Sequence, residues 1–406
     1  MSVMELEHIP DGVDKKEASP NDMMQYAVEV LKGYTETTPL IEMDVLYGNN
    51  QLLVKNEAEQ VTGSFKARGA YVKMNALKYE LEQFAEQNPD RQLPVVTGAS
   101  AGNHGVAMAN AARELQITTT VYVPESTSPE RIARIEAFGI DSDEKQWVTV
   151  VPHGKTVDKA IEKAEESEWV VPPFNDRLVM AGQGTMALEI MEQTRGNVAK
   201  IFIGAGGGGG AAGSAEALRD YPGVEVVIVQ LEGNDSVQRS VEAGRVKPAS
   251  NLDRVCVGSA VVRSGPECIQ TLIEHKRRIS FVTVSPADIG ACIVREDRLR
   301  QEHAAVMGED AFIGFPEATG TLAEAGAYKY AQNVRLRAEQ DPEHADFAPR
   351  DEVWVAIRSG SNVDTKAEDK LVAAWHASET ARKRANTSQR VGALATIVSG
   401  GHVGAR

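Results

Sequence analysis

The stretch TGSFKARGA places a single lysine, Lys66, among small residues and directly after an aromatic, Phe65. A lysine is ordinarily an exposed and solvated charge on a flexible stem. If the amine is buried, however, it is partly unprotonated near neutral pH and can act as a nucleophile or a base. Lys66 is therefore a candidate catalytic residue, provided that other chemical groups converge on it.

A run of glycines, GAGGGGGAAG (Gly204–Gly213), lies between a predicted strand and a predicted helix. Without Cβ atoms the backbone can approach a ligand, and the amides of a helix N-terminus favour an anion. Phosphate binding is the leading interpretation, and a purely structural turn is the alternative. The run also contains GxGxxG at Gly204, Gly206 and Gly209, with Glu232 after the next predicted strand, so a dinucleotide site stays open.

Two further polar stretches stand at the ends of predicted strands. ASAGNHG follows one strand and begins a helix, so Ser100, Asn103 and His104 converge where a carboxylate can be bound by neutral donors and the helix dipole. The alternative is that Ser100 or Asn103 only caps that helix. RSGSN (358–362) follows a late buried strand, and ligands of open α/β sheets gather at such strand ends.

The elements that must position these residues alternate between apolar β-branched runs and helical patterns, which is typical of an α/β protein with mainly parallel strands. We expect strands at 52–56, 94–100, 118–124, 147–151, 200–206, 224–232 and 352–360. We expect helices at about 103–115, at 129–138 between an N-cap at Ser128 and a stop at Gly139, at 157–167, around AGQGTMALEI, and from about Gly213, with a surface loop at 338–351. Residues 94–170 are predicted to form a small βαβ domain inserted into a larger one, 1–93 and 171–406.

Composition restricts the class of ligand. The 406-residue chain carries a net charge of -15, with 42% hydrophobic and 25% charged residues. This charge opposes binding to nucleic acid or to anionic membranes and favours a small-molecule ligand. Cys256, Cys268 and Cys292 show no CxxC spacing and are expected to be buried free thiols. There is no N-terminal export signal and no long apolar run, so we expect a cytoplasmic protein.

Taken in order, SFKARGA, SAGNHG, AGQGT and GGGG resemble the pyridoxal-phosphate (PLP)-dependent serine/threonine dehydratases. The resemblance runs from TTPL (Thr37–Leu40) to SGSNVD. It implies the two-domain fold type II, typified by the tryptophan synthase β subunit, with parallel sheets covered by helices on both faces. It also implies a homo-oligomer, either a dimer or a tetramer, that acts on a small amino acid.

The resemblance assigns roles to the candidate residues. Lys66 matches the lysine that forms a Schiff base with PLP, and Phe65 matches the aromatic beside it. Asn103 matches the residue that bonds the 3-oxygen of the cofactor, while Ser100 and His104 match the loop that receives the substrate carboxylate. Three other sets of residues match cofactor contacts: the phosphate loop is Gly206, Gly207, Gly208, Gly209 and Gly210, the serine facing the pyridine nitrogen is Ser359, and a glutamate near the cofactor is Glu317. The usual SGGN or SGAN of the family reads SGSN here, a departure that places Ser361 near the ring edge.

The implied reaction is β-elimination of L-threonine or L-serine, or both, to a 2-oxo acid and ammonia. Ala101 matches the position at which related serine racemases carry a serine, so elimination is expected to dominate over racemisation. Some relatives bind a cation at an acidic residue. Gln230 stands at the matching position, with Glu232 nearby, and we expect no metal. The alternatives are a β-replacing synthase of the threonine or cysteine synthase type, a racemase and, more distantly, an NAD-dependent dehydrogenase or a non-catalytic binding protein.

Overall fold

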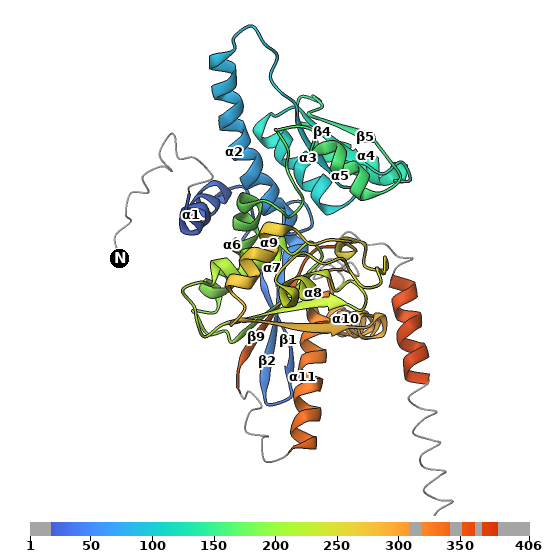
Figure 1. Ribbon diagram of the computed structural model, residues 1–406. Helices are drawn as coiled ribbons and strands as arrows, with labels where there is room; N and C mark the ends of the chain where they lie inside the picture. Colours follow the sequence, from blue (N-terminus) through green and yellow to red (C-terminus); the bar gives the residue numbers. More distant parts are fainter. Residues whose placement is uncertain (1–17, 308–318, 342–350, 362–367, 381–406) are drawn as a thin grey trace, which may run out of the picture.

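The computed structural model describes residues 18–307, with side chains up to residue 298, and residues 319–341, 351–361 and 368–380. The described chain forms two sheets. In Figure 1 the smaller sheet and its helices lie above the larger one.

The larger sheet has six strands in the order β1-β2-β9-β6-β7-β8. Its strands are β1 (Leu40–Leu46), β2 (Asn50–Asn56), β6 (Lys200–Gly204), β7 (Glu225–Leu231), β8 (Ile279–Val284) and β9 (Val353–Arg358). Every neighbouring pair is parallel except β1 and β2, which form an antiparallel hairpin at one edge. The carboxyl ends of β2, β9, β6 and β7 therefore meet at one end of the sheet, where the candidate residues are expected.

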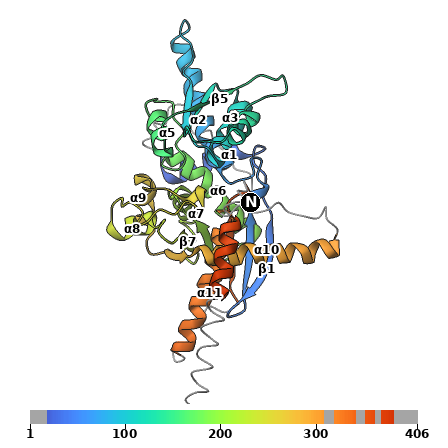
Figure 2. The same cartoon turned by 90° about the vertical axis from the view of Figure 1, so that its right-hand side faces the viewer.

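Helices cover both faces of this sheet. Side chains alternate along a strand, so Ile201 and Ile203 of β6 pack on one face while Phe202 packs on the other. The first face is covered by α6 (Arg177–Gln193), α7 (Gly209–Ala217), α8 (Ser236–Ala243) and α9 (Pro266–Glu274). The second face is covered by α10 (Pro286–Met307) and α11 (Leu322–Gln340), with a further helix at 368–380 that contributes Leu371 (Figure 2). The predicted fold class is confirmed.

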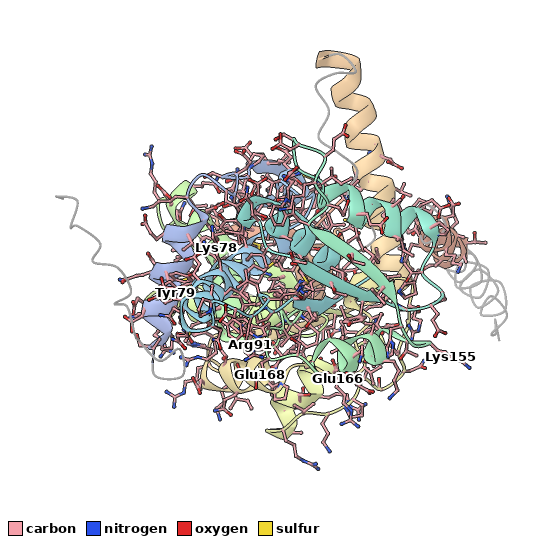
Figure 3. All side chains as sticks on the ribbon, turned by 90° about the horizontal axis from the view of Figure 1, so that it is seen from above. Lys78, Tyr79, Arg91, Lys155, Glu166 and Glu168 are labelled. Carbon is pink, nitrogen blue, oxygen red and sulfur yellow. The ribbon has the colours of Figure 1, made fainter. Side chains whose placement is uncertain are left out.

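The smaller sheet contains three parallel strands in the order β3 (Val96–Ala99), β4 (Thr119–Val123) and β5 (Val148–Pro152). Its core joins α2 (Lys66–Gln87), α3 (Asn103–Leu115) and α4 (Pro129–Phe138), while α5 (Val157–Ala164) packs on the other face. Seen from above, the exposed Lys155 and Glu166 lie at its periphery (Figure 3). The sheet lies within residues 94–170, but the domain boundaries themselves stay a prediction.

The remaining elements connect the two sheets. Helix α1 (Pro20–Leu31) begins at a capping box formed by Ser19 and Asp22, and it packs against α2 and α6. A single 3-10 turn, η1 (Glu57–Glu59), leads from β2 toward α2. Within the described residues, no helix is both long and apolar enough to cross a membrane.

The expected helix boundaries were wrong in three places. Helix α7 begins at Gly209 rather than near Gly213, because tight packing of its glycine-rich first turn outweighs the poor helix propensity of glycine. Helix α11 runs to Gln340, so 338–340 are not loop; the stretch RLRAEQ is rich in good helix formers. Helix α5 ends at Ala164, short of 167. The rest of the predicted loop, 342–350, lies outside the described residues.

Candidate functional site

Lys66 is the first residue of α2, and its amine is buried at the site. The amine donates a hydrogen bond to the carbonyl oxygen of Pro173 at 2.7 Å. The centroid of the Phe65 ring lies 5.2 Å from the same nitrogen. Burial lowers the pKa of Lys66 to about 8. A substantial fraction of the amine is therefore neutral near pH 8.

The carboxyl end of β9 lies directly beside this lysine. Ser64 and Gly360 form an antiparallel bridge, and the Phe65 amide donates to the carbonyl oxygen of Ser359 at 3.2 Å. The Ser359 side chain is 8% exposed, and its hydroxyl donates to the carbonyl oxygen of Thr319 at 3.3 Å. The structure thus brings together Lys66, Phe65 and Ser359, which are almost 300 positions apart in the chain.

The glycine loop between β6 and α7 approaches the same point. An ideal Cβ on Gly210 would lie 3.3 Å from Cε2 of Phe65, while one on Gly207 would lie 2.3 Å from the Phe174 ring. Gly208 adopts φ +99°, which disfavours any side chain. The first-turn amides of α7 have no helical acceptors and can receive an anion. The geometry is therefore compatible with both interpretations of the glycine run, phosphate binding and a structural turn. The loop packs tightly against protein and also presents the amides of a helix N-terminus.

The ASAGNHG loop forms the N-terminus of α3. Gly102 is the N-cap and no side chain caps the helix, so the capping alternative is wrong for both Ser100 and Asn103. The Ser100 hydroxyl instead accepts a hydrogen bond from the Gly102 amide at 3.1 Å, and Asn103 is the first helical residue. These two residues can therefore present polar groups at a positively polarised helix end.

His104 in this loop is buried and neutral. Its Nε2 pairs with the carbonyl oxygen of Val171 at 3.0 Å, which makes this nitrogen the donor, and its Nδ1 has no hydrogen-bond partner in the described part of the chain. Burial, and next the charge of Lys66, lower the pKa of His104 to about 3. The imidazole thus lies close to the lysine and cannot serve as a cation toward a carboxylate.

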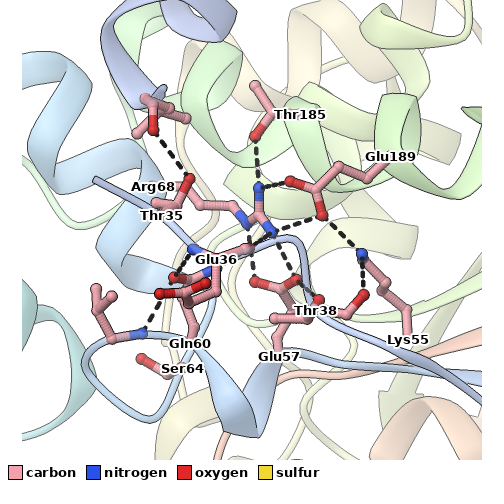
Figure 4. Close-up of polar contacts among 12 residues, drawn as sticks. Thr35, Glu36, Thr38, Lys55, Glu57, Gln60, Ser64, Arg68, Thr185 and Glu189 are labelled. Carbon is pink, nitrogen blue, oxygen red and sulfur yellow. Dashed lines mark hydrogen bonds and ion pairs between the residues drawn. The ribbon is translucent and has the colours of Figure 1, made fainter. Parts of the chain in front are cut away.

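Buried charges fix the start of α2. The Arg68 guanidinium binds Glu57 with two hydrogen bonds and also contacts Glu189, which in turn binds Lys55 at 2.6 Å (Figure 4). Burial alone would raise the pKa of Glu57, but the Arg68 charge and its hydrogen bonds hold it below the ordinary value. Two cations thus balance two carboxylates, and α2 is tied to β2 and α6 within one turn of Lys66.

The AGQGT motif has a packing role that its sequence did not reveal. A Cβ on Gly182 would lie 2.7 Å from the Cα of Gly69, and one on Gly184 would lie 2.5 Å from the Gly213 carbonyl oxygen. Helix α6 therefore contacts the backbone of α2 on one side and of α7 on the other. It sets the separation between the lysine and the glycine loop.

Sequence reasoning missed the residues that receive the lysine. Residues 171–174, VPPF, accept hydrogen bonds through three carbonyl groups, from His104, Lys66 and Cys268. The usable signal was the pair Pro172–Pro173, because proline has no N–H and leaves only carbonyls to bond. We call this stretch the 171–174 segment.

The remaining expectations concern the cysteines, a possible cation site and two residues near the cofactor. All three cysteines are buried and free, as expected. Gln230 is buried and both ends of its amide bond to protein, at Asn234 and Gln238. In the described part of the chain, no group of three or more His, Cys, Asp or Glu residues could hold a metal ion. The hydroxyl of Ser361 points to the carbonyl oxygen of Ala58. Glu317 lies outside the described residues.

Comparison with known proteins agrees with this geometry. Residues 31–301 match the family described as "Pyridoxal-phosphate dependent enzyme". The chain is 31% identical over 313 residues to the biosynthetic L-threonine dehydratase of Salmonella typhimurium, covering 75% of this chain and 54% of the relative. It is 32% identical over 268 residues to that of Lactococcus lactis, covering 63% and 61%. The chain thus spans a little over half the length of these relatives.

Solved structures show the same fold. The processed form of threonine deaminase isoform 2 from Solanum lycopersicum superposes with a TM-score of 0.68 at 27% identity, covering 88% of this chain and 94% of that one. The serine racemase of Dictyostelium discoideum superposes with a TM-score of 0.62 at 22% identity, covering 84% and 98%. At that identity the likeness to the racemase concerns the fold alone.

Proposed function

Because the chain belongs to the family of pyridoxal-phosphate dependent enzymes, we propose that it eliminates the β-hydroxyl of L-threonine, L-serine or both, releasing a 2-oxo acid and ammonia. The observation that carries the proposal is the buried Lys66 amine, with its lowered pKa, between the glycine loop, Ser359 and the start of α3. The similarity to relatives named threonine dehydratase supports the choice of reaction.

The residues at the site fit pyridoxal phosphate. Lys66 offers an amine that is neutral in part, which is the form that reacts with an aldehyde. The N-terminus of α7 offers amides to a phosphate beside Gly207–Gly210. Phe65 borders the lysine, and the neutral Ser359 hydroxyl can face a ring nitrogen without forcing a proton onto it. Asn103, at the start of α3, is the proposed partner of the 3-oxygen.

Each side chain then has a definite task. When bound, the cofactor supplies the electron sink for chemistry at the substrate Cα. The Lys66 amine takes the Cα proton of the substrate, because its buried nitrogen is partly unprotonated. Ser100 and the amides at the start of α3 hold the substrate carboxylate. His104 supports this loop through Val171 as a neutral donor.

The choice between the two substrates rests on one methyl group. Such a difference is worth only about 1–3 kcal/mol in a pocket, so we propose activity on both amino acids at different rates.

We also propose that the protein is a homo-oligomer, either a dimer or a tetramer, and light scattering of the pure protein tests this. A small domain formed by residues 94–170 is proposed as well. The cytoplasm is the proposed location.

An absorption spectrum and a product assay test the function. The purified protein is expected to show the visible absorbance of bound PLP, to lose the covalently bound species in Lys66→Ala, and to form 2-oxo acid from L-threonine and L-serine. Lys78→Ala is the matched control, since Lys78 lies on the same helix, about three turns beyond Lys66. A colourless protein that cannot be reconstituted with PLP contradicts the proposal. A coloured protein that makes no oxo acid supports a synthase or a binding role instead.

A further inference from the structure

The 171–174 segment receives three side chains from three different helices. His104 of α3 donates to Val171 O at 3.0 Å, Lys66 of α2 donates to Pro173 O at 2.7 Å, and Cys268 of α9 donates from Sγ to Phe174 O at 3.2 Å. The position of this short stretch therefore decides where the lysine amine rests.

Phe174 also connects the segment to the glycine loop. Its ring fills the space that a Cβ of Gly207 would occupy, and its backbone lies 2.9 Å from an ideal Cβ of Gly209. The carbonyl oxygen of Gly207 in turn accepts a hydrogen bond from the Gly265 amide at 3.0 Å, just before α9. The segment, the glycine loop and the start of α9 thus form one packed unit.

Two hydrogen bonds hold the segment against α9. The Asn175 Oδ1 accepts from the Glu267 amide at 2.9 Å, and one residue later on α9 the Cys268 thiol donates to Phe174. An ideal Cβ on Gly208 would lie 3.2 Å from Cβ of Cys268, so the glycine loop packs closely against this residue of α9. Cys268 thus contacts the glycine loop and also supplies the donor to Phe174.

The thiol also determines the electrostatic environment of the amine. Among the described residues, the titratable groups facing Lys66 are the His104 imidazole from α3 and the Cys268 thiol from α9. Burial raises the pKa of Cys268 to about 12, so the thiol is neutral when the amine titrates. The lysine nitrogen thus rests on a carbonyl and beside a neutral sulfur, and no described residue places an anion beside it.

We propose that Cys268 is a positioning residue for Lys66: its thiol holds the Phe174 carbonyl and so keeps the 171–174 segment, with the carbonyl that receives the lysine amine, closed over the glycine loop. The importance of this role for catalysis rests on the proposed function. The effect of Cys268 on the position of the Lys66 amine can be measured whether or not the proposed function is correct.

The test measures Lys66 directly in the cofactor-free protein. Brief labelling with acetic anhydride across pH 6–11, read by mass spectrometry of the Lys66 peptide, gives the pH midpoint of the amine. In the wild-type protein the midpoint is expected near pH 8. Cys268→Ala is expected to raise the midpoint by about one unit, because the released segment admits water. Cys268→Ser retains a neutral donor and is expected to stay near wild type, as is the control Cys292→Ala in the core on the other face of the large sheet.

A second readout is the half-life of bound PLP, which should shorten about tenfold in Cys268→Ala and not in Cys292→Ala. Asn175→Ala removes the other bond to α9 and, should Cys268→Ala fail to fold, is expected to move both readouts in the same direction. A Lys66 midpoint that is the same in wild type and in Cys268→Ala, or that moves equally in Cys292→Ala, overturns the proposal. Absence of PLP binding in wild type would instead contradict the proposed function and leave the titration valid.

Discussion

Arg68 and Glu57 form a doubly hydrogen-bonded ion pair, both bonds 2.8 Å long, two residues beyond Lys66. Both side chains are almost completely buried, at 1% and 0% exposure. A buried pair adds little net stability compared with apolar residues, but removal of one partner leaves a buried charge uncompensated. The pair therefore makes the position of the lysine sensitive to a residue that does not touch it.

Arg68→Met is accordingly expected to lower the free energy of unfolding by about 3–5 kcal/mol, since Glu57 would keep a buried charge without its partner. Urea unfolding followed by circular dichroism measures this. Arg335→Met is the control, because Arg335 pairs with Glu339 in an exposed position and its loss should leave the free energy of unfolding nearly unchanged. Equal effects of the two substitutions would contradict the role of burial.

Gly207→Ala is expected to weaken retention of PLP, because the new methyl group would meet the Phe174 ring at 2.3 Å. Without a Cβ the backbone at this position can approach a ligand, and the structure shows that a side chain here would first displace Phe174. Adding Phe174→Ala should therefore restore part of the retention, measured as PLP bound after gel filtration. Gly223→Ala is the matched control, since no heavy atom lies within 4 Å of its ideal Cβ. Retention lost by Gly223→Ala, or NAD binding lost by Gly207→Ala, would contradict this account.

Glu296→Gln is expected to be tolerated and to change the pH dependence of stability. Burial, and next the neighbouring Glu324 carboxylate, raise the pKa of Glu296 from 4.5 to about 9, so the folded protein keeps it protonated beside Arg358. Between these values the folded chain binds one proton more than the unfolded chain. The free energy of unfolding therefore falls as pH rises, by at most about 1.4 kcal/mol per pH unit.

The glutamine variant lacks this proton and should lose less stability than wild type between pH 6 and 9 in urea unfolding. Glu339→Gln, in an exposed pair, is the control and should leave the slope unchanged. Identical slopes in wild type and Glu296→Gln would show that Glu296 is ionised in the folded protein.

Wild type is expected to form 2-oxo acid from L-serine without accumulating D-serine. Racemisation needs a proton donor on the face opposite Lys66, and the alanine at position 101, just before the N-cap of α3, has no proton to give. Ala101→Ser is expected to introduce some D-serine formation, which chiral chromatography detects. D-serine produced by wild type at a rate comparable to pyruvate would instead indicate a racemase.

Much of the fold could be predicted because buried parallel strands are recognisable as short β-branched runs. KIFIG and VEVVIVQ both lie in the centre of the large sheet, as expected. The edge strands β1 and β8 were missed, since their residues are largely half-exposed and their sequence alternation is weak. An edge strand forms because it pairs with a neighbouring strand, and the local sequence does not specify that neighbour.

Those parts of the candidate site that depend on the type of side chain could be proposed from the sequence. Lys66 and the glycine loop were singled out because their residue types are unusual in their contexts. Ser359 was singled out because it follows a predicted strand and matches a residue of the resembled family, and the structure places all three close together. The acceptors at Val171, Pro173 and Phe174 were not found, because a backbone carbonyl is the same in every residue and only the fold determines which donor it meets. Cys268 was expected only as a buried thiol for the same reason.

The 171–174 segment is also the return path of the chain from the smaller sheet to the larger one. The Val171 amide is bonded to Thr97 of β3, while Asp176 caps the start of α6. Any rotation of the smaller sheet relative to α6 must therefore move the acceptors of Lys66 and His104 together. Motions of the smaller sheet relative to the larger one would then be mechanically coupled to the freedom of the Lys66 amine.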